Sequence, residues 1–173
     1  MDARKAAVIR SLRTASLVAL VTSGCLALGC WSAYQKTYDK TYTDLNAQAD
    51  AQQKAEEAAH AEAQKYASVV YFATGSAQID EEGQRDIAWF VEKMKPFPLA
   101  MLDVQGFTDS TGDDAKNVSL SAQRAQAVVD ALVARGIDAS HIRQAHYAAN
   151  YQATTNNTPK GRRNNRRVEI TVQ

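Results

Sequence analysis

The chain contains no glycine or proline between Trp31 and Thr74. Within this stretch, "QADAQQKAEEAAHAEAQKYA" consists mainly of Ala, Gln, Glu and Lys, which are strong helix formers. We therefore predict one long helix over residues 34–67, which would reach on the order of 50 Å at ~1.5 Å per residue. Heptad spacing from Tyr34 gives positions that begin apolar and become polar after Leu45, whereas a coiled coil needs apolar positions throughout. This pattern indicates a solvated helical spacer that can self-associate only near its start.

The segment before the spacer, residues 1–33, has the features of a membrane anchor. "MDARKAAVIRSLR" is basic, and residues 14–34 carry no charge. This order is typical of an export signal, and a run of about 20 residues is also long enough to cross a bilayer once. Two interpretations stay open: a lipoprotein signal, and a single transmembrane helix with its basic side in the cytoplasm. Both place the rest of the chain outside the cytoplasm.

We prefer the lipoprotein interpretation. Small or apolar residues precede both cysteines of the chain, as a lipoprotein processing site requires. Cys30 is the better lipidation candidate because polar sequence begins soon after it, and Cys25 is the alternative. An acylated cysteine would hold the mature chain on a membrane.

Residues 68–173 read as one α+β domain. Strands are predicted in residues 68–79, 99–106, 140–148 and 166–173, and helices over residues 81–95 and 119–136. Asp80 is expected to cap the first helix and Gly136 to end the second. The apolar stripe of the second helix is expected to contain Leu120, Val128, Leu132 and Val133. This βαβαββ order predicts a mixed sheet with the helices on one face, and residues 150–165 are expected to form a polar loop.

Composition and motifs exclude several classes of function. Residues 68–173 contain twelve basic and twelve acidic residues, whereas a domain that binds duplex nucleic acid usually has a basic excess. The domain has no cysteine and no HExxH, GxSxG or P-loop motif, and His141 and His146 lack a paired nucleophile. We therefore expect neither an enzyme nor a metal or cofactor site.

The stretch "GFTDSTGDDAKNVSLSAQRA" is the strongest candidate for a binding site. Asp109 lies in a turn that directly follows a predicted strand, and Arg124 lies on the next helix. Both can reach one end of the sheet, where a carboxylate beside a guanidinium suits a zwitterion. A structural salt bridge is the alternative. Asp113 and Asp114 lack the Gly and Glu spacing of a calcium loop and are expected to be solvated turn residues. The basic run "KGRRNNRRVEI" is either an anion-binding surface or a solvated loop.

These residues resemble a known family. "GFTDSTGDDAKNVSLSAQRAQAVVDALVARGI", followed much later by "NRRVEI", is similar to the OmpA-like C-terminal domain, and "VYFATGSAQI" matches its first strand and loop. The resemblance implies a domain that binds peptidoglycan without cutting it, by holding the zwitterionic end of diaminopimelate in the stem peptide. Asp109 would then take the ammonium and Arg124 the carboxylate.

The resemblance also assigns a lining to this pocket. Arg166 or Arg167 would supply a second cation, with the other residue pointing away, and Gly75 would contribute only backbone. The remaining motif positions are Thr108, Thr111, Asn117, Leu120 and Ser121. The main departure is Phe107, which stands where the family usually has histidine, and we expect it to change loop packing or pH response and not the charge pair.

We therefore expect a membrane-anchored, non-catalytic protein that tethers the envelope to peptidoglycan and faces the periplasm as an outer-membrane lipoprotein. A single-pass inner-membrane protein is the alternative. A second hypothesis is a structural subunit of an envelope-spanning secretion or motility complex, with partner proteins contacting Tyr34, Tyr38 and Tyr42. A proton-conducting stator is disfavoured because residues 14–34 contain no Asp or Glu. A wall-metabolising enzyme would need a nucleophile or metal site that the motifs do not provide.

Overall fold

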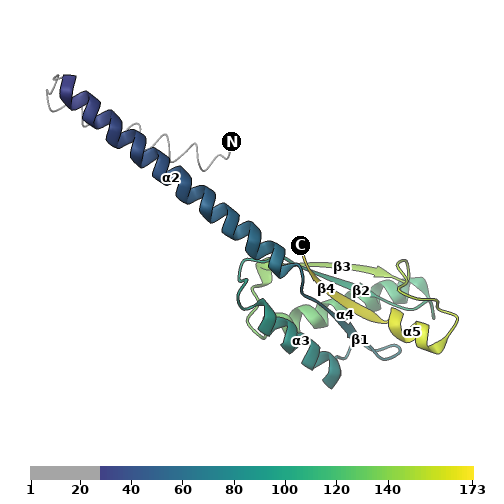
Figure 1. The fold of residues 1–173 in the computed structure, drawn as a ribbon. Coiled ribbons are helices and arrows are strands. Elements are labelled where there is room, and N and C mark those ends of the chain that lie inside the picture. Colours follow the sequence, from purple (N-terminus) through teal and green to yellow (C-terminus); the bar gives the residue numbers. More distant parts are fainter. Residues whose placement is uncertain (1–27) are drawn as a thin grey trace. The chain divides into compact units, whose positions relative to one another are not determined.

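The computed structural model of the protein describes residues 28–173 (Figure 1). The described part of the chain divides into two units between Gln53 and Lys54. The first described element is α2 (Leu28–Ala63), which contributes to both units. Cys30 falls in the first turn of this helix, whereas Cys25 and most of the apolar N-terminal run lie outside the described residues. No helix within residues 28–173 combines the length and apolar character needed to cross a membrane.

The body of the protein is built on a four-stranded sheet in the order β1-β4-β2-β3. Its strands are β1 (Ala67–Tyr71), β2 (Leu102–Phe107), β3 (Ile142–Ala148) and β4 (Arg167–Val172). The last strand lies in the middle, antiparallel to both β1 and β2, and β3 runs parallel to β2 at the edge. This arrangement confirms the predicted mixed sheet.

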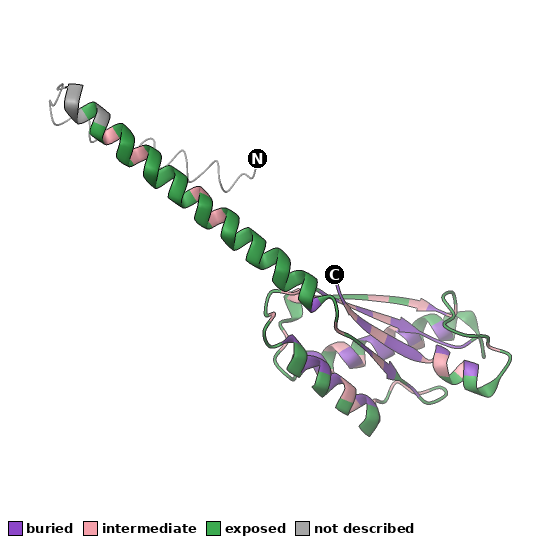
Figure 2. Ribbon diagram, viewed as in Figure 1, coloured by how far each residue is buried: buried purple, intermediate pink, exposed green. Residues whose placement is uncertain are grey.

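Two helices, α3 (Glu81–Met94) and α4 (Asp114–Val133), pack on the sheet as predicted (Figure 1). The side chain of Asp80 caps α3 by accepting a hydrogen bond from the Gly83 N–H, which confirms its predicted role. Alternate residues of β2 and β4 are buried, because successive side chains of a strand point to opposite faces. The core that results is purple in Figure 2 and contains Val70, Ile87, Phe90, Leu102, Val104, Val128, Leu132, Val168 and Ile170.

The predicted apolar stripe of α4 was wrong at one position. Val133 is exposed, and Leu120 is only half-buried. The buried face of α4 is instead partly polar: Ser121 and Arg124 lie fully buried on the same side as Val128 and Leu132. The helix also starts five residues before the predicted boundary, because Asp113 caps it by accepting a hydrogen bond from the Ala115 N–H.

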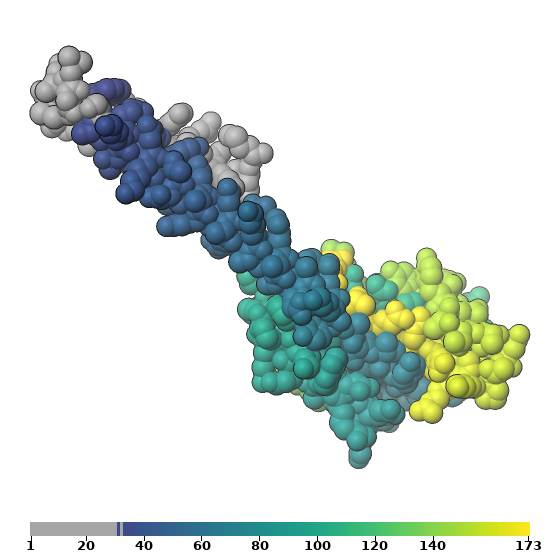
Figure 3. All heavy atoms as spheres, viewed as in Figure 1, coloured from purple at the N-terminus to yellow at the C-terminus, as the bar shows by residue number. Residues whose placement is uncertain are grey.

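A short helix, α5 (Pro159–Asn165), occupies part of the segment predicted to be an irregular polar loop. Thr158 caps it by accepting a hydrogen bond from the Gly161 N–H, and proline fills its first position, where a backbone N–H is dispensable. The Asn165 amide, which is fully buried, accepts hydrogen bonds from the backbone of Ala153 and Thr154. These bonds hold the loop after β3 against α5 at one end of the body (Figure 3).

The end of β3 contains a residue in the left-handed backbone region. Ala148 has φ +50°, at the irregularity where Phe107 of β2 pairs one residue further along β3 than the register predicts. Its carbonyl accepts a 2.8 Å hydrogen bond from the Thr108 N–H, so this strained residue supports the turn that follows β2. An alanine in this region costs about 1–2 kcal/mol, and glycine avoids that cost.

Ala148→Gly is therefore expected to raise the free energy of unfolding by about 0.5–1 kcal/mol, after allowance for the greater freedom of glycine in the unfolded chain. Urea denaturation monitored by circular dichroism measures the change. Gly136→Ala is the matched control: Gly136 has φ +97° and open space around it, so alanine there should destabilise. A less stable Ala148→Gly variant would contradict the strain that we infer at this position.

Candidate functional site

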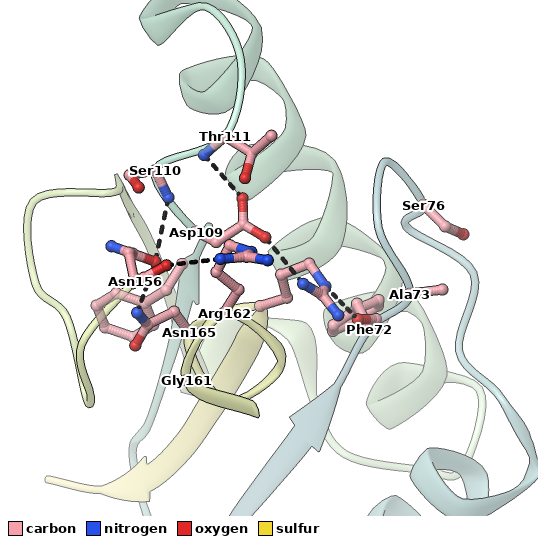
Figure 4. Close-up of polar contacts among 12 residues, drawn as sticks. Phe72, Ala73, Ser76, Asp109, Ser110, Thr111, Asn156, Gly161, Arg162 and Asn165 are labelled. Carbon is pink, nitrogen blue, oxygen red and sulfur yellow. Dashed lines mark hydrogen bonds and ion pairs between the residues drawn. The ribbon is translucent and has the colours of Figure 1, made fainter. Parts of the chain in front are cut away.

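The C-terminal end of β2 carries a buried carboxylate, Asp109, which is 4% exposed. One of its oxygens accepts a 3.0 Å hydrogen bond from the Thr111 N–H. The other forms a 2.8 Å ion pair with the Arg166 guanidinium, which comes from the residue just before β4 (Figure 4). Both partners are charge-complementary to a carboxylate, so Asp109 is held ionised in one orientation.

The two adjacent arginines, Arg166 and Arg167, have different partners, and Arg166 is the one that pairs with Asp109. Arg166 also donates a 3.0 Å hydrogen bond to the Phe72 carbonyl, and its side chain is 13% exposed. Arg167 points elsewhere: it pairs with Glu169 at 2.6 Å, and its guanidinium lies 4.1 Å from the centre of the Phe107 ring. The expected alternation of the two arginines is therefore present, with Arg166 facing Asp109.

The guanidinium of Arg124 lies at the bottom of the same region and is fully buried. It donates three hydrogen bonds to backbone carbonyls: 2.8 Å to Ser76, 3.0 Å to Ala73 and 3.2 Å to Phe107. These carbonyls belong to the loop after β1 and to the end of β2, so one side chain ties both segments to α4. Gly75, in that loop, has φ +68° and allows the tight turn in which the Ser76 N–H bonds the Ala73 carbonyl.

The environment of Arg124 changes its titration. Burial above all, and the nearby positive charge of Arg166, lower the pKa of the guanidinium to about 10, and Asp109 acts in the opposite direction. The side chain stays cationic at neutral pH. Two guanidinium groups thus accompany one carboxylate, and this cluster carries a net positive charge that favours a ligand with a carboxylate.

Other residues assigned to the pocket by the resemblance take several positions. Asn117 is buried and donates a 3.2 Å hydrogen bond to the Thr111 carbonyl, which fixes the turn that holds Asp109. Ser121 donates within its own helix, to the Val118 carbonyl, and Leu120 is half-buried beside it. The hydroxyl of Thr108 is buried and has no hydrogen-bond partner among the described residues.

Phe107 occupies an apolar environment that suits its ring. The residue is 3% exposed and stacks on Tyr147 with ring centres 5.6 Å apart. The Arg167 guanidinium also lies over its ring. Its backbone carbonyl, not its side chain, faces the charged cluster through the hydrogen bond from Arg124. The aromatic ring therefore serves packing of the turn and leaves the Asp109 and Arg124 charges unaltered.

Two asparagines that could not be recognised as functional from sequence support the site. The Asn156 side chain accepts hydrogen bonds from the Ser110 N–H at 3.3 Å and from the Asn165 amide at 2.9 Å (Figure 4). Arg162 donates to the Asn156 backbone carbonyl at 2.9 Å. The turn beside Asp109 is thus connected to Asn156, 46 residues after Ser110 in the chain, and through Asn165 to α5. The Thr-Pro pair that caps α5 is the sequence signal that could have revealed this connection.

The pH dependence of stability should report on Asp109. Burial by itself raises the pKa of this carboxyl, but the hydrogen bonds from Arg166 and Thr111 together outweigh burial and lower it below the usual range. A lowered folded-state pKa stabilises the protein above the unfolded value, about 3.9, and this contribution disappears as pH falls through the folded value. The stability difference between wild type and Asp109→Asn should be constant above about pH 5 and shrink below about pH 4. Urea denaturation from pH 3 to pH 7 tests this, and a difference that grows on acidification would contradict it.

No group of three or more His, Cys, Asp or Glu side chains that could hold a metal ion occurs within residues 28–173. The chemistry on offer in this cluster is charge recognition, through one carboxylate and two guanidinium groups. Such an arrangement is chemically suited to a ligand that carries a carboxylate, and an ammonium group in addition where Asp109 takes part.

Comparison with known proteins agrees with this fold. Residues 71–166, more than half of the chain, match the OmpA family, and the chain belongs to this family. It is 46% identical over 81 residues to the peptidoglycan-binding protein ArfA of Mycobacterium tuberculosis, which covers 47% of this chain and 25% of ArfA. It is 38% identical over 103 residues to the probable lipoprotein YiaD of Escherichia coli, covering 60% of this chain and 47% of YiaD. The matched region thus spans a quarter to about half of these relatives.

Solved structures show the same architecture. The cell wall anchor of the type VI secretion system (T6SS) from Pseudomonas aeruginosa is 29% identical, with a TM-score of 0.54 over 61% of this chain and 79% of the anchor. The peptidoglycan-associated lipoprotein of Burkholderia pseudomallei has a TM-score of 0.58 over 61% of this chain and 90% of that chain, at 24% identity. The second likeness concerns the fold alone.

Proposed function

We propose that this protein binds peptidoglycan without cleaving it, through the charged cluster at the end of β2. The observation that carries the proposal is the buried Asp109 carboxylate beside the Arg124 and Arg166 guanidinium groups, in a domain of the OmpA family. The descriptions of two similar proteins support this proposal. ArfA is a peptidoglycan-binding protein, and the similar P. aeruginosa protein is a cell wall anchor.

The ligand that suits the cluster is the zwitterionic end of diaminopimelate in the stem peptide. Asp109 takes the ammonium group, and the two guanidinium groups attract the carboxylate. Arg166 keeps exposed surface, whereas Arg124 has none, so the carboxylate reaches Arg124 only when the turn at Ala73–Ser76 shifts. The unpaired Thr108 hydroxyl, next to Asp109, adds a hydrogen-bonding group for the same ligand.

The rest of the chain then makes the protein a tether. Residues 1–33 anchor it to a membrane, with Cys30 as the lipidation site and Cys25 as the alternative, and α2 spaces the wall-binding body from that membrane. The outer membrane is the proposed location, and residues 34–67 and 68–173 are the proposed spacer and binding domain. Fatty-acid labelling of wild type, Cys30→Ser and Cys25→Ser tests the anchor, and absence of label in wild type would contradict lipidation.

A second candidate function is a structural subunit of an envelope-spanning complex. The likeness to the cell wall anchor of the P. aeruginosa T6SS favours it, because that domain works as an anchor in such an assembly. Wall binding would then position the complex. Stable co-purification with other envelope proteins after mild solubilisation would support this function over a simple tether.

Asp109→Asn is expected to weaken binding to purified sacculi by at least ~30-fold, which corresponds to about 2 kcal/mol or more for losing one partner of a buried charge pair. The change keeps the shape of the side chain and removes its charge. Asp114→Asn, the same substitution at the exposed first residue of α4, is the matched control and should bind like wild type. Thermal unfolding of both variants shows that the domain is folded.

Competition with small molecules tests the ligand itself. Free diaminopimelate should displace the protein from sacculi, whereas pimelate, which has only the carboxylates, and cadaverine, which has only the ammonium groups, should not. Wild-type affinity of Asp109→Asn would overturn the assignment of the cluster. Displacement by pimelate alone would show that the ligand is an anion and not a zwitterion.

A further inference from the structure

One face of α2 carries a regular series of large apolar side chains. The aromatic face, as we call it, consists of Trp31, Tyr34, Tyr38, Tyr42, Leu45 and Ala49. Successive members are three, four, four, three and four residues apart, which is an 11-residue repeat. Such a repeat averages 3.67 residues per turn and stays on one side of a nearly straight helix. Heptad spacing from Tyr34 places Thr41 in the series instead of Tyr42. The apolar series therefore appears interrupted in heptads and continuous in the 11-residue repeat.

The aromatic face is partly open to solvent: three of its residues are exposed, and Tyr34, Tyr38 and Ala49 are half-buried. Trp31 is 60% exposed, Leu45 41% and Tyr42 40%, and α2 is largely green in Figure 2. The rings of Trp31, Tyr34, Tyr38 and Tyr42 follow one another along the helix, with each neighbouring pair of centres 6.3 Å apart. From residue 31 to residue 49 the face is free of charge over roughly 27 Å of helix.

A membrane surface does not explain a face of this length and charge pattern. The headgroup layer is only ~5–8 Å thick on each side of a bilayer, much less than ~27 Å for a helix that stands out from it. A helix that lies flat on lipid usually has a basic polar face. The polar side of α2 is instead mixed in charge. It contains the acidic residues Asp39, Asp44 and Asp50 together with Lys36 and Lys40. A second helix with the same repeat fits the face along its whole length.

We propose that α2 pairs through its aromatic face with the same face of a second copy of this chain, parallel and in register. The orientation follows from the charges beside the face. One flank contains Asp39, Asn46 and Asp50, and the other contains Thr37, Thr41 and Gln48. In a parallel pair each flank meets the opposite flank of its partner, so the acids face neutral side chains. In an antiparallel pair the acidic flanks would face each other.

The size of this interface decides where the pair forms. Eight rings from two copies, each burying about half of the ~150–250 Å² that an aromatic side chain offers, remove on the order of 800 Å² from water. That area is at the lower limit for a specific interface, so chains that are free in dilute solution should associate weakly. The proposed function places the chain on a membrane. Two copies held on the same membrane meet at a much higher effective concentration than free chains do.

Photo-crosslinking of the full chain in cells tests the pair directly. p-Benzoylphenylalanine replaces Tyr38, on the aromatic face, in one variant, and replaces Lys40, on the opposite side of the helix, in the matched control. A co-expressed second copy with a different tag identifies the adduct. We expect a copy-to-copy adduct from position 38 and at least tenfold less from position 40. An adduct with another protein or with lipid, equal adducts from both positions, or no adduct would each overturn the proposal.

A pair of triple variants supplies a second measurement. Tyr34→Ala, Tyr38→Ala and Tyr42→Ala together should reduce copy-to-copy crosslinking with a bifunctional amine reagent by about tenfold or more. Thr43→Ala, Asp44→Ala and Ala47→Gln together change the other side of α2 without removing a lysine and should leave it within twofold. Alanine favours helix more than tyrosine does, so unfolding of α2 would not account for a loss. Undiminished crosslinking in the tyrosine variant would overturn the pairing.

The outcome is independent of wall binding. Asp109→Asn should crosslink through α2 as wild type does, and the triple tyrosine variant should still bind sacculi, although with lower avidity if two domains act together. Loss of sacculus binding in Asp109→Asn with intact crosslinking supports both proposals. Intact sacculus binding without crosslinking overturns only the pairing.

Discussion

Arg124→Ala is expected to lower the free energy of unfolding by about 3–5 kcal/mol, one of the largest effects of any single substitution in the body of the protein. The side chain is fully buried, and its removal takes one hydrogen bond from each of the carbonyls of Ala73, Ser76 and Phe107, of which Ala73 keeps the bond from the Ser76 N–H. Each unsatisfied buried carbonyl costs about 1–3 kcal/mol, and the vacated volume adds a cavity cost. Relief from burying a charge offsets part of this sum.

Urea denaturation measures this effect against two related variants. Arg124→Lys keeps the charge but has a single nitrogen, which does not reach three separate carbonyls, so its stability should be intermediate. Arg135→Ala, near the end of the same helical segment, removes an exposed arginine and should cost less than about 1 kcal/mol. An Arg124→Ala protein within 1 kcal/mol of wild type would show that the carbonyls find other partners. Because Arg124→Ala is expected to destabilise the fold, a loss of binding in this variant would not distinguish misfolding from loss of a ligand contact. Asp109→Asn is the variant that tests ligand recognition.

Gly106→Ala is expected to destabilise the body by about 3 kcal/mol or more. A Cβ atom at Gly106 would lie 2.2 Å from the backbone carbonyl oxygen of Ser121 and 3.2 Å from the Ala125 Cβ. Both belong to α4, which packs directly on β2 at this point. The helix would have to move away from the sheet as a unit, and Arg124 would move with it, away from the carbonyls that it binds.

Gly83→Ala is the control for this prediction. A Cβ at Gly83 also meets atoms at 2.8 Å, but these are γ-methyl groups of the Ile79 and Val70 side chains and not backbone, so side-chain repacking can make room without moving a helix. Alanine in the first turn of α3 also gains up to about 1 kcal/mol of helix propensity over glycine. The thermal midpoint of Gly106→Ala should fall much further than that of Gly83→Ala. Equal midpoints would show that α4 can shift on the sheet without penalty.

Much of the fold could be predicted from sequence because its signals are local. Alternation in β4 and helical periodicity in α3 report directly on which side chains are buried. The buried face of α4 was harder to predict, because Ser121 and Arg124 are polar and their burial depends on carbonyls 17 to 51 residues away. Val133 is apolar and follows Leu132 of the predicted stripe, yet it lies on the exposed side of α4. α5 was missed because it is short and polar, and contacts with the preceding loop, not an apolar face, stabilise it.

The candidate site divides in the same way. Asp109 and Arg124 could be named from their positions after a strand and on the following helix. The pairing of Asp109 with Arg166 could not be derived from spacing, because 57 residues separate them and either of two adjacent arginines was suitable. The support from Asn156 depends on a loop whose path is determined by tertiary hydrogen bonds. The local sequence pattern thus predicted which charged residues belong to the candidate site, and only the structure shows which of them are in contact.

The pairing of β1 with β4 has a mechanical consequence for a tether. The chain enters the body at Ala67, the start of β1, whereas Asp109 and Arg166 lie at the opposite end of the sheet. Tension between membrane and wall would therefore run along the length of β1. All the hydrogen bonds between β1 and β4 lie across that direction and would be sheared together, instead of opening one at a time from an end. The topology of this small sheet makes it resist the force that its proposed position in the envelope would impose.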